Sequence, residues 1–431
     1  MTVPQHITQR RFAISKLPET AYGVPYTDDA DFVDFVCKDK TFADDAPSVA
    51  DNKEYSTGYR QATEQWIVAH ELTKTYEFDV CSEIIGRLLL AAFGAVVSTQ
   101  PDSVGAPTVW KHVFTIQDLT VSRQLPSFTG VEQLKPAIDR RLVGLVMEAL
   151  TLKGEGSQRL QGSANFRGSG KLVSPSGVDI DPATGLNYFY ESQVTFKLDD
   201  GVSVNNFANA PNRLNSWQFG IANQLLADDG YRPGAARFQE DGNPDSGETR
   251  SEMLIGDQTF NPSFNARLLS DSTLFDAITT QKEFDGLWDI VGKQIVAVDT
   301  TDDTQGGDFN VLTNPVTVDK ADYPGITPVV GDYYKIGNEI LRVSAVAMAT
   351  FTLERGQLGT AIAVHADAVS IFKLYHNRLI VEAFRMPFKT RKIADRNGLV
   401  SLDITPNVLF DVDNNRDVRV TLYNTVASYT S

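Results

Sequence analysis

The sequence predicts a mainly β protein, a β-sandwich or barrel with flanking α-helices, possibly duplicated, that carries a small inserted β domain. The 431 residues include 31 Gly and 19 Pro, and stretches rich in Thr, Val, Phe and Tyr outnumber long amphipathic patterns. Short runs of alternating polar and apolar residues recur along the chain, as half-buried strands require. One order of elements, strand, strand, helix, strand, occurs twice.

Charge and hydropathy exclude several classes of protein. The chain has 39 Lys and Arg against 55 Asp and Glu, a net charge of −16, and its bases are not segregated, which disfavours ordinary binding to duplex DNA. Hydrophobic residues make up 42% and charged residues 22%, which is typical of a folded chain. The longest apolar run, residues 88–97, is well short of the ~20 residues that a spanning helix needs, so no membrane contact is expected.

No catalytic, cofactor or metal site is expected. Cys37 and Cys81 form no CxxC pair, and the five His residues show no HxH or HxxxH spacing. Residues 167–171 lack the first glycine of a phosphate loop. Residues 411–417 alternate like the start of a calcium loop, but Arg416 stands where the turn needs Gly. We interpret the protein as not an enzyme, although the many acids leave a two-carboxylate glycosidase open.

The first copy of the repeated order lies between residues 64 and 117. Residues 64–70 and 75–80 are predicted strands, Ser82 is a predicted N-cap, and a helix then ends at Gly94. A strand over 110–117 completes the copy. The helix has one apolar face, formed by Ile85, Leu88, Leu89, Ala92 and Phe93.

The second copy begins at residue 252. Strands over 252–260 and 263–269 precede Ser272, a second predicted N-cap, and a helix that ends near Gly286. Leu274, Phe275 and Ile278 supply its apolar face. Further strands are predicted over residues 142–153, 158–168, 188–198, 217–225, 378–384, 398–404 and 417–423.

These patterns predict a discontinuous domain organisation. Residues 1–135 form an N-terminal half, and residues 136–290 with 376–431 form a second half. Residues 291–375, with short strands punctuated by Gly, form the inserted small β domain. Residues 28–54 carry nine acids against three bases and are predicted to be a solvated arm or loop.

Two resemblances indicate a function. Residues 330–343 (VGDYYKIGNEILRV), 351–360 (FTLERGQLGT) and 364–366 (VHA) resemble a small β module that recurs in structural proteins of tailed bacteriophages. The rest of the chain resembles the tail tube (major tail) proteins of long-tailed bacteriophages. That second resemblance rests on residues 216–233, with SWQFGIANQL at their start, on 252–284, and on the ending 378–424, which closes on VRVTLYN.

The tail tube resemblance implies a structural virion protein made in the host bacterial cytoplasm. Sandwiches of the family join side by side into rings around a channel, and long loops or arms stack the rings. The implied partners are further copies of the chain, in trimeric pseudo-sixfold or hexameric rings, and other tail proteins such as the tape measure, the tail terminator and the baseplate. Viral DNA would pass through without specific binding during genome delivery.

Two other functions stay open. A tail-tip or baseplate ring protein would share the fold but occur in few copies. A host-adhesion, carbohydrate-binding β-sandwich protein would need aromatic residues on loops. Trp66, Trp110 and Trp217 instead lie in predicted strands, and only Trp288 lies near a boundary.

The resemblance also suggests which residues meet the channel and the neighbouring ring. Candidate channel-facing acids are Asp199, Asp200, Glu252 and Glu382. Phe32, Phe35, Val36 and Phe42 are candidate stacking residues of the arm, because exposed apolar side chains need a partner surface. The inserted domain is expected on the outer surface, where it would not obstruct a duplex.

Overall fold

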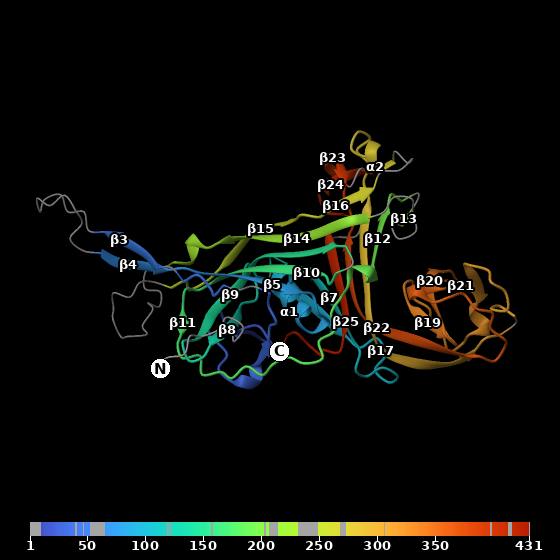
Figure 1. Ribbon diagram of the computed structural model, residues 1–431, viewed down its shortest axis with the longest axis horizontal. Coiled ribbons are helices and arrows are strands. Elements are labelled where there is room, and N and C mark those ends of the chain that lie inside the picture. The colour runs from blue at the N-terminus through green and yellow to red at the C-terminus, as the bar shows by residue number, and fades with distance from the viewer. Residues whose placement is uncertain are drawn as a thin grey trace, which may run out of the picture.

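The fold is mainly β and consists of two large antiparallel sheets packed face to face around one helix (Figure 1). This confirms the predicted fold class. The computed structural model describes residues 10–38, 41–45, 47–51, 65–118, 120, 122–156, 158–201, 204–206, 214–231, 249–267, 273–305, 307–396, 399–412 and 416–430. Within these ranges no helix has the length and apolar character that crossing a bilayer requires.

The first sheet, which we call the long sheet, runs lengthwise through the molecule (Figure 1). Its strands in order are β5 (Leu72–Asp79), β10 (Gln161–Gly168), β9 (Ile138–Glu155), β14 (Leu214–Leu226), β16 (Ser263–Arg267), β24 (Leu399–Pro406) and β23 (Phe388–Arg396). A further strand, β15 (Leu254–Phe260), pairs with the far end of β14. The first half of β9 continues the sheet through β8 (Phe128–Leu134) and β1 (Arg11–Ser15) to β2 (Phe32–Asp34), and also pairs β11 (Leu172–Val173).

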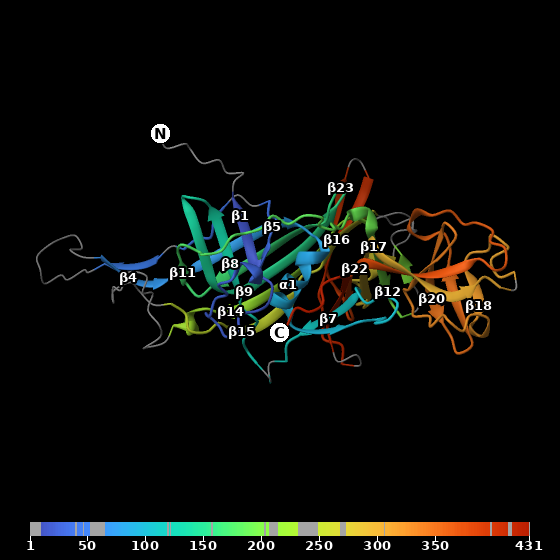
Figure 2. The ribbon, with the colours of Figure 1, turned by 90° about the horizontal axis from the view of Figure 1, so that it is seen from below.

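The second sheet crosses the first and extends to one end of the molecule (Figures 1 and 2). Its strands in the body are β13 (Val204–Asn206), β12 (Val194–Asp199), β17 (Asp285–Asp303), β22 (Ser370–Ala383), β25 (Val418–Asn424), β7 (Trp110–Ile116) and β6 (Gly94–Thr99). Beyond the body β22 pairs β19 (Tyr333–Ile336), which leads to β20 (Glu339–Val346), β21 (Thr350–Glu354) and β18 (Val316–Asp319).

Helix α1 (Ser82–Phe93) is buried between the two sheets rather than packed on one of them. All of its residues except Glu83 are buried, so the prediction of a single apolar face was too narrow. The N-cap is Cys81, not the predicted Ser82, which is already helical. The predicted stop is confirmed: Gly94 has φ of 89°, a left-handed conformation that favours glycine and ends the helix.

The predicted second helix is only a single turn. α2 spans Thr273–Asp276, and the chain then continues in turns, with Gln281 at a φ of 51°, before β17 begins. Leu274 and Phe284 are buried in the main core, so the apolar residues anchor a loop instead of forming a helix face. Ser272, the predicted N-cap, lies outside the described residues.

The chain follows the same path twice. β5 leads into α1 and the β6–β7 pair, and β16 leads into α2 and the β17–β22 pair. Each half then adds two further strands, β9 with β10 and β23 with β24, which pair with each other. β10 pairs β5, as β24 pairs β16. The repeat predicted from element order is therefore also a repeat of strand pairing, and β14 joins the two halves by pairing both β9 and β16.

The group of strands at the end of the second sheet has a hydrophobic core of its own, which we call the module core. It contains twelve buried residues between Phe309 and Ile371. Beside it the buried carboxylate of Glu339 accepts hydrogen bonds from Arg355 Nε at 2.9 Å and Nη2 at 2.7 Å, and contacts His365 Nε2 at 2.8 Å. The same carboxylate accepts from the backbone N–H groups of Gly356 and Ala363, which ties the 355–365 loop to β20.

We predict that Glu339→Gln destabilises this part of the chain by about 3–5 kcal/mol, because it leaves the Arg355 guanidinium buried without its counter-charge. Chemical denaturation followed by hydrogen exchange in residues 309–371 would measure the effect. Glu283→Gln is the matched control, since the Glu283–Arg385 pair is more than 40% exposed at both side chains and is expected to contribute about 1 kcal/mol or less. Equal effects of the two substitutions would contradict the prediction.

Glu191 links the two sheets just before β12. Its carboxylate accepts a hydrogen bond from Trp217 Nε1 at 3.1 Å, and a Cβ at Gly154 would lie only 1.8 Å from Glu191 Oε2. Burial raises the pKa of Glu191 to about 7, although the Trp217 hydrogen bond opposes the shift.

This shift predicts a pH dependence. Between the ordinary pKa of 4.5 and about 7, folding takes up a proton at Glu191, so the free energy of unfolding falls as the pH rises through this window. Glu191→Gln keeps an acceptor for Trp217 and removes the charge. The effect of this substitution on the free energy of unfolding should be more favourable at pH 8 than at pH 4.5, by about 1–3 kcal/mol. Denaturation curves at both pH values would measure this. An unchanged pH dependence in the variant would contradict the assignment.

Candidate functional site

One face of the long sheet is polar from β5 to β23, and we call it the polar face. The cross-strand row Glu155, Ser216, Asn265, Asp403 and Lys392 shares this face, and so does the row Gln161, Lys153, Gln218 and Ser263. The opposite face buries Tyr76, Phe166, Leu150, Phe219 and Phe264 in the main core. Period-two alternation therefore gives the sheet one buried face and one face covered with small and polar side chains.

The exposed charges on the polar face sum to a small negative value. They are Glu77, Glu155, Asp257 and Asp403 against Lys153 and Lys392, four acids and two bases. The chain as a whole has a net charge of −16, so most of the negative excess lies elsewhere.

Strand β23 ends the long sheet with an open edge. It pairs β24 on one side and no strand among the described residues on the other. On the face that continues the main core, Ile393 is 59% exposed and Val400 on β24 is 51% exposed. An open edge next to exposed aliphatic side chains is a surface that another chain can cover.

The other end of the long sheet is only partly covered. Isolated bridges join Cys37 to Phe78 and Asp44 to Thr73, so the chain lies beside β5 at these two points. The Glu132 carboxylate accepts from the N–H of Ala43, and Arg140 donates to the Ala43 carbonyl at 2.8 Å.

A two-stranded ribbon follows in the chain, and from here on we call this ribbon the arm. Its two strands, β3 (Pro47–Asp51) and β4 (Gln65–His70), pair with each other and with no other described strand. They project from the end of the molecule opposite to the module core (Figures 1 and 2). Val49 is 51% exposed and Val68 is 46% exposed. Lys74, buried on β5, lies 3.5 Å from Glu132 and holds the root of the arm through a hydrogen bond to the Thr41 carbonyl.

Most of the predicted stacking residues pack within their own chain. Phe32 and Phe35 are buried, and Phe42 packs against the main core with its ring 5.9 Å from that of Phe12. Only Val36, 46% exposed, is free to meet a partner. The stacking role was predicted because exposed apolar side chains need a partner surface. That argument holds for Val36 and for the exposed valines of the arm, but not for the three Phe residues.

The four predicted channel acids do not come together. Asp199 and Glu382 lie on the second sheet, where Glu382 accepts two hydrogen bonds from Arg419 at 2.6 and 2.7 Å. Asp200 is buried in an ion pair with Lys282, and Glu252 precedes β15. Their position relative to a channel stays a prediction.

Two assembly features escaped sequence reasoning. β23 was missed because neither of its faces is uniformly apolar, and its only signal is its length match to the predicted neighbouring strand. β3 was assigned to a loop because it is short and mostly exposed, although its partner β4 was predicted as a strand.

No chemical site emerges among the described residues. They contain no group of three or more His, Cys, Asp or Glu side chains that could hold a metal ion. Neither Cys37 nor Cys81 forms a disulfide, and burial raises the pKa of Cys81 to about 12, which leaves it protonated and unreactive.

Comparison with known families decides the assignment. The family model described as phage tail tube protein matches residues 10–327. The chain belongs to the phage tail tube protein family. No curated protein matches it. As a tail tube protein it is a structural component of the virion that assembles with itself and with other tail proteins, and this family role is not an enzymatic one.

Proposed function

We propose that this tail tube protein forms rings of three copies, whose long sheets join edge to edge around a channel that conducts DNA during genome delivery. The observation that carries the proposal is the repeated chain path that leads both halves into one sheet with one polar face. Three chains with two similar halves each would give a pseudo-sixfold ring.

The junction inside the chain suggests the junction between chains. In the first half, β9 pairs β14 from Ala149–Ala222 to Glu155–Ser216. In the second half, β23 takes the place of β9 in the chain path, but on the edge away from β24 it pairs with no described strand. The partner it lacks would come from the next copy, and ring closure would satisfy the open edge without added sequence.

The repeat also indicates which strand supplies that partner. β14 precedes and pairs β16, and in the first half Cys37 and Asp44 precede β5 and form bridges to it. The outward backbone groups of Ala43 are already bonded to Glu132 and Arg140. Because these groups of Ala43 are not available to a further strand, we assign the pairing with β23 to the start of β3, the next strand along the chain.

The polar face supports a role as the channel wall. Its small negative charge offers phosphate groups no basic patch to bind, while the net charge of −16 on each chain repels DNA at longer range. The duplex would then slide with small local barriers. We assign Asp199, Asp200 and Glu382 to this long-range field and not to the channel wall. Asp199 and Glu382 lie on the second sheet, and Asp200 forms an ion pair with Lys282.

The arm supports stacking of the rings. An isolated two-stranded ribbon is marginally stable in water, so the arm would gain most of its stability from a neighbouring ring. At the other end, the β17–β22 ribbon carries the module core away from the long sheet (Figure 1). This placement supports an outer-surface position for the inserted domain, residues 291–375. The proposal also keeps the two halves predicted from the sequence, residues 1–135 and residues 136–290 with 376–431.

The alternatives differ in what they require. A tail-tip or baseplate ring protein would occur in few copies per particle, so quantitative proteomics of purified virions separates it from a tube subunit. A carbohydrate-binding adhesin with exposed Trp side chains is not favoured, because Trp217 and Trp288 are buried.

We predict that Ile393→Lys blocks ring formation and leaves the monomer folded. The substitution places a charge on an apolar surface that ring closure would bury, which costs several kcal/mol for an unpaired charge. Met348→Lys is the control, since Met348 is 98% exposed in the inserted domain. Sedimentation velocity and negative-stain images would measure assembly. Rings of Ile393→Lys that match those of the control would contradict the proposed junction.

Shortening the arm should separate ring formation from stacking. Replacing residues 49–68 by a short Gly-Ser link keeps the root pairs of Pro47 with His70 and Ser48 with Ala69. We expect single rings instead of tubes, because the contact with the next ring is lost while the ring junction is kept. Negative-stain length distributions would report this. Tubes of ordinary length would show that the arm is not a stacking element.

A further inference from the structure

A pocket lies between the inserted domain and the body of the chain, at a place that the tube proposal does not use. It has a volume of about 290 Å³ and is lined by residues of β6, β7, β22 and β25, the loop that follows β6, and the start of β19 with the loop before it. This size is at the lower end of ligand pockets, about 300–1,000 Å³, and fits one ring-sized ligand.

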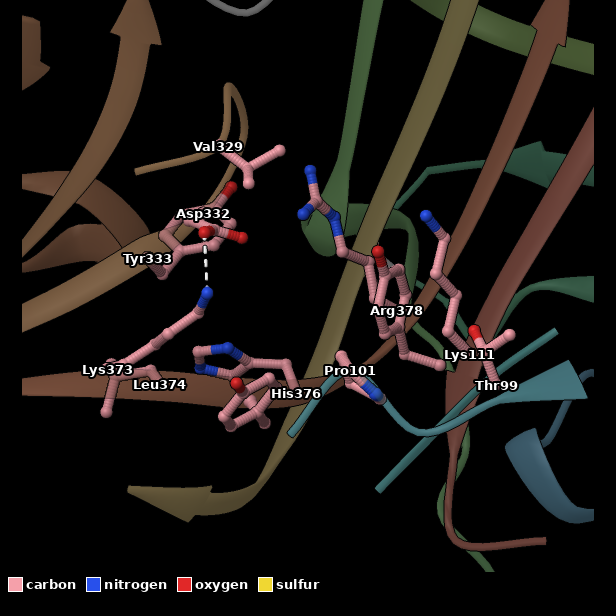
Figure 3. A pocket seen from close by; sticks show the side chains of 12 residues that line it. Thr99, Pro101, Lys111, Val329, Asp332, Tyr333, Lys373, Leu374, His376 and Arg378 are labelled. Atoms are coloured by element: carbon pink, nitrogen blue, oxygen red, sulfur yellow. Dashed lines mark hydrogen bonds and ion pairs between the residues drawn. The ribbon is translucent and has the colours of Figure 1, made fainter. Parts of the chain in front are cut away.

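The strand register builds the floor of the pocket. Thr99, Lys111, Tyr423 and Arg378 are consecutive cross-strand neighbours on the outer face of the second sheet. A register shift in β17 after Val291 bends the ribbon that leads to the inserted domain. Figure 3 shows the result: Val329, Asp332 and Tyr333 face Thr99 and Lys111 across the pocket, with Lys373 and His376 on the strand between them.

Most charges in the pocket are already compensated. Arg378 donates to both carboxylate oxygens of Asp289 at 2.7 Å, and also donates to the Gly331 carbonyl at 2.8 Å. Lys373 pairs with Asp332 at 2.7 Å. His376 adds no charge at neutral pH, because burial and then Arg378 lower its pKa to about 4.

Lys111 is different. Its ammonium lies 5.9 Å from the centre of the Tyr423 ring and makes no ion pair with any described residue. The pocket therefore holds one uncompensated positive charge on a chain whose net charge is −16. A ligand with a single negative charge would neutralise it, and the field of the remaining acids would disfavour a more highly charged anion.

The other free groups are hydroxyls. Those of Tyr333, Tyr375, Tyr423 and Thr99 make no hydrogen bond with any residue in the described part of the chain, so they can donate to a ligand rich in acceptors. The aromatic rings, together with Val329, Leu374 and Pro101, supply apolar surface beside these donors.

We propose that this pocket binds an acidic sugar residue, with its carboxylate on Lys111, its hydroxyls on the tyrosine hydroxyls and its C–H face on the tyrosine rings. A sugar acid combines one negative charge, many acceptors and an apolar ring face in one ring-sized unit. Inorganic phosphate shares the anionic group but lacks the ring face.

Calorimetric titration of the full chain with glucuronate, glucose and inorganic phosphate tests the proposal. We expect glucuronate to bind in preference to the other two, and added salt to weaken it. Lys111→Gln should reduce glucuronate affinity ~10-fold or more, as loss of a charge-assisted hydrogen bond does. Lys389→Gln, which removes a lysine exposed on β23, is the matched control and should leave the affinity unchanged.

Three results would overturn the proposal. Equal binding of glucose and glucuronate would remove the role of the carboxylate. Phosphate binding as tight as glucuronate binding, and equally sensitive to Lys111→Gln, would mark a general anion site. If ~10 mM glucuronate shows no binding, its binding free energy is weaker than about 3 kcal/mol, and the site is excluded. None of these results depends on ring or tube formation, so they leave the proposed function untouched.

Discussion

Hydrogen bonding along the edges of the strands in the long sheet is the constraint on which the rest of the molecule depends, because every strand has two edges whose N–H and C=O groups need partners. Inside the chain this requirement is met by joining two halves that follow the same path, with β14 pairing β9 on one side and β16 on the other. Among the described strands, the same path leaves one edge of β23 without a partner strand. The ring proposed above would supply that partner from a further copy of the chain.

Burial of α1 explains how the two sheets can stay apart and still share one core. The helix inserts between them, and even Arg87 is buried, with Nη1 bonded to the Glu83 carbonyl and its guanidinium 5.7 Å from the Tyr429 ring. In the second half α2 is too short to play this part, and aromatic side chains pack between the sheets. The Trp288 ring lies 4.9 Å from that of Phe196 and 5.8 Å from that of Phe219. The two halves thus share strand pairing but not core packing, which is why little residue identity accompanies the repeat.

The sequence predicted those features that depend on local pattern. Strands with one buried face, the end of α1 at Gly94 and the module-like strands after residue 330 all follow from alternation and turn residues. It did not predict features that depend on partners far along the chain. Phe32, Phe35 and Phe42 look exposed in an acidic segment, but they pack on residues of β1, β5 and their neighbours. The positions of Asp199, Asp200, Glu252 and Glu382 could not be predicted for the same reason: alternation shows which residues share a face, whereas the register of distant strands decides which faces meet.

Charge has different roles at short and long range in this molecule. At contact distance the exposed charges of the polar face sum to only a small negative value, so in the proposed channel a phosphate would meet neither a basic patch nor a strong local barrier. Beyond contact the net charge of −16 is felt, but only over the ~10 Å that salt near 0.1 M allows. A wall that was itself strongly acidic would add repulsion at contact, where it would also strain the ring by like-charge repulsion between neighbouring copies. In the proposed ring, a wall whose exposed charges sum to only a small negative value avoids that cost.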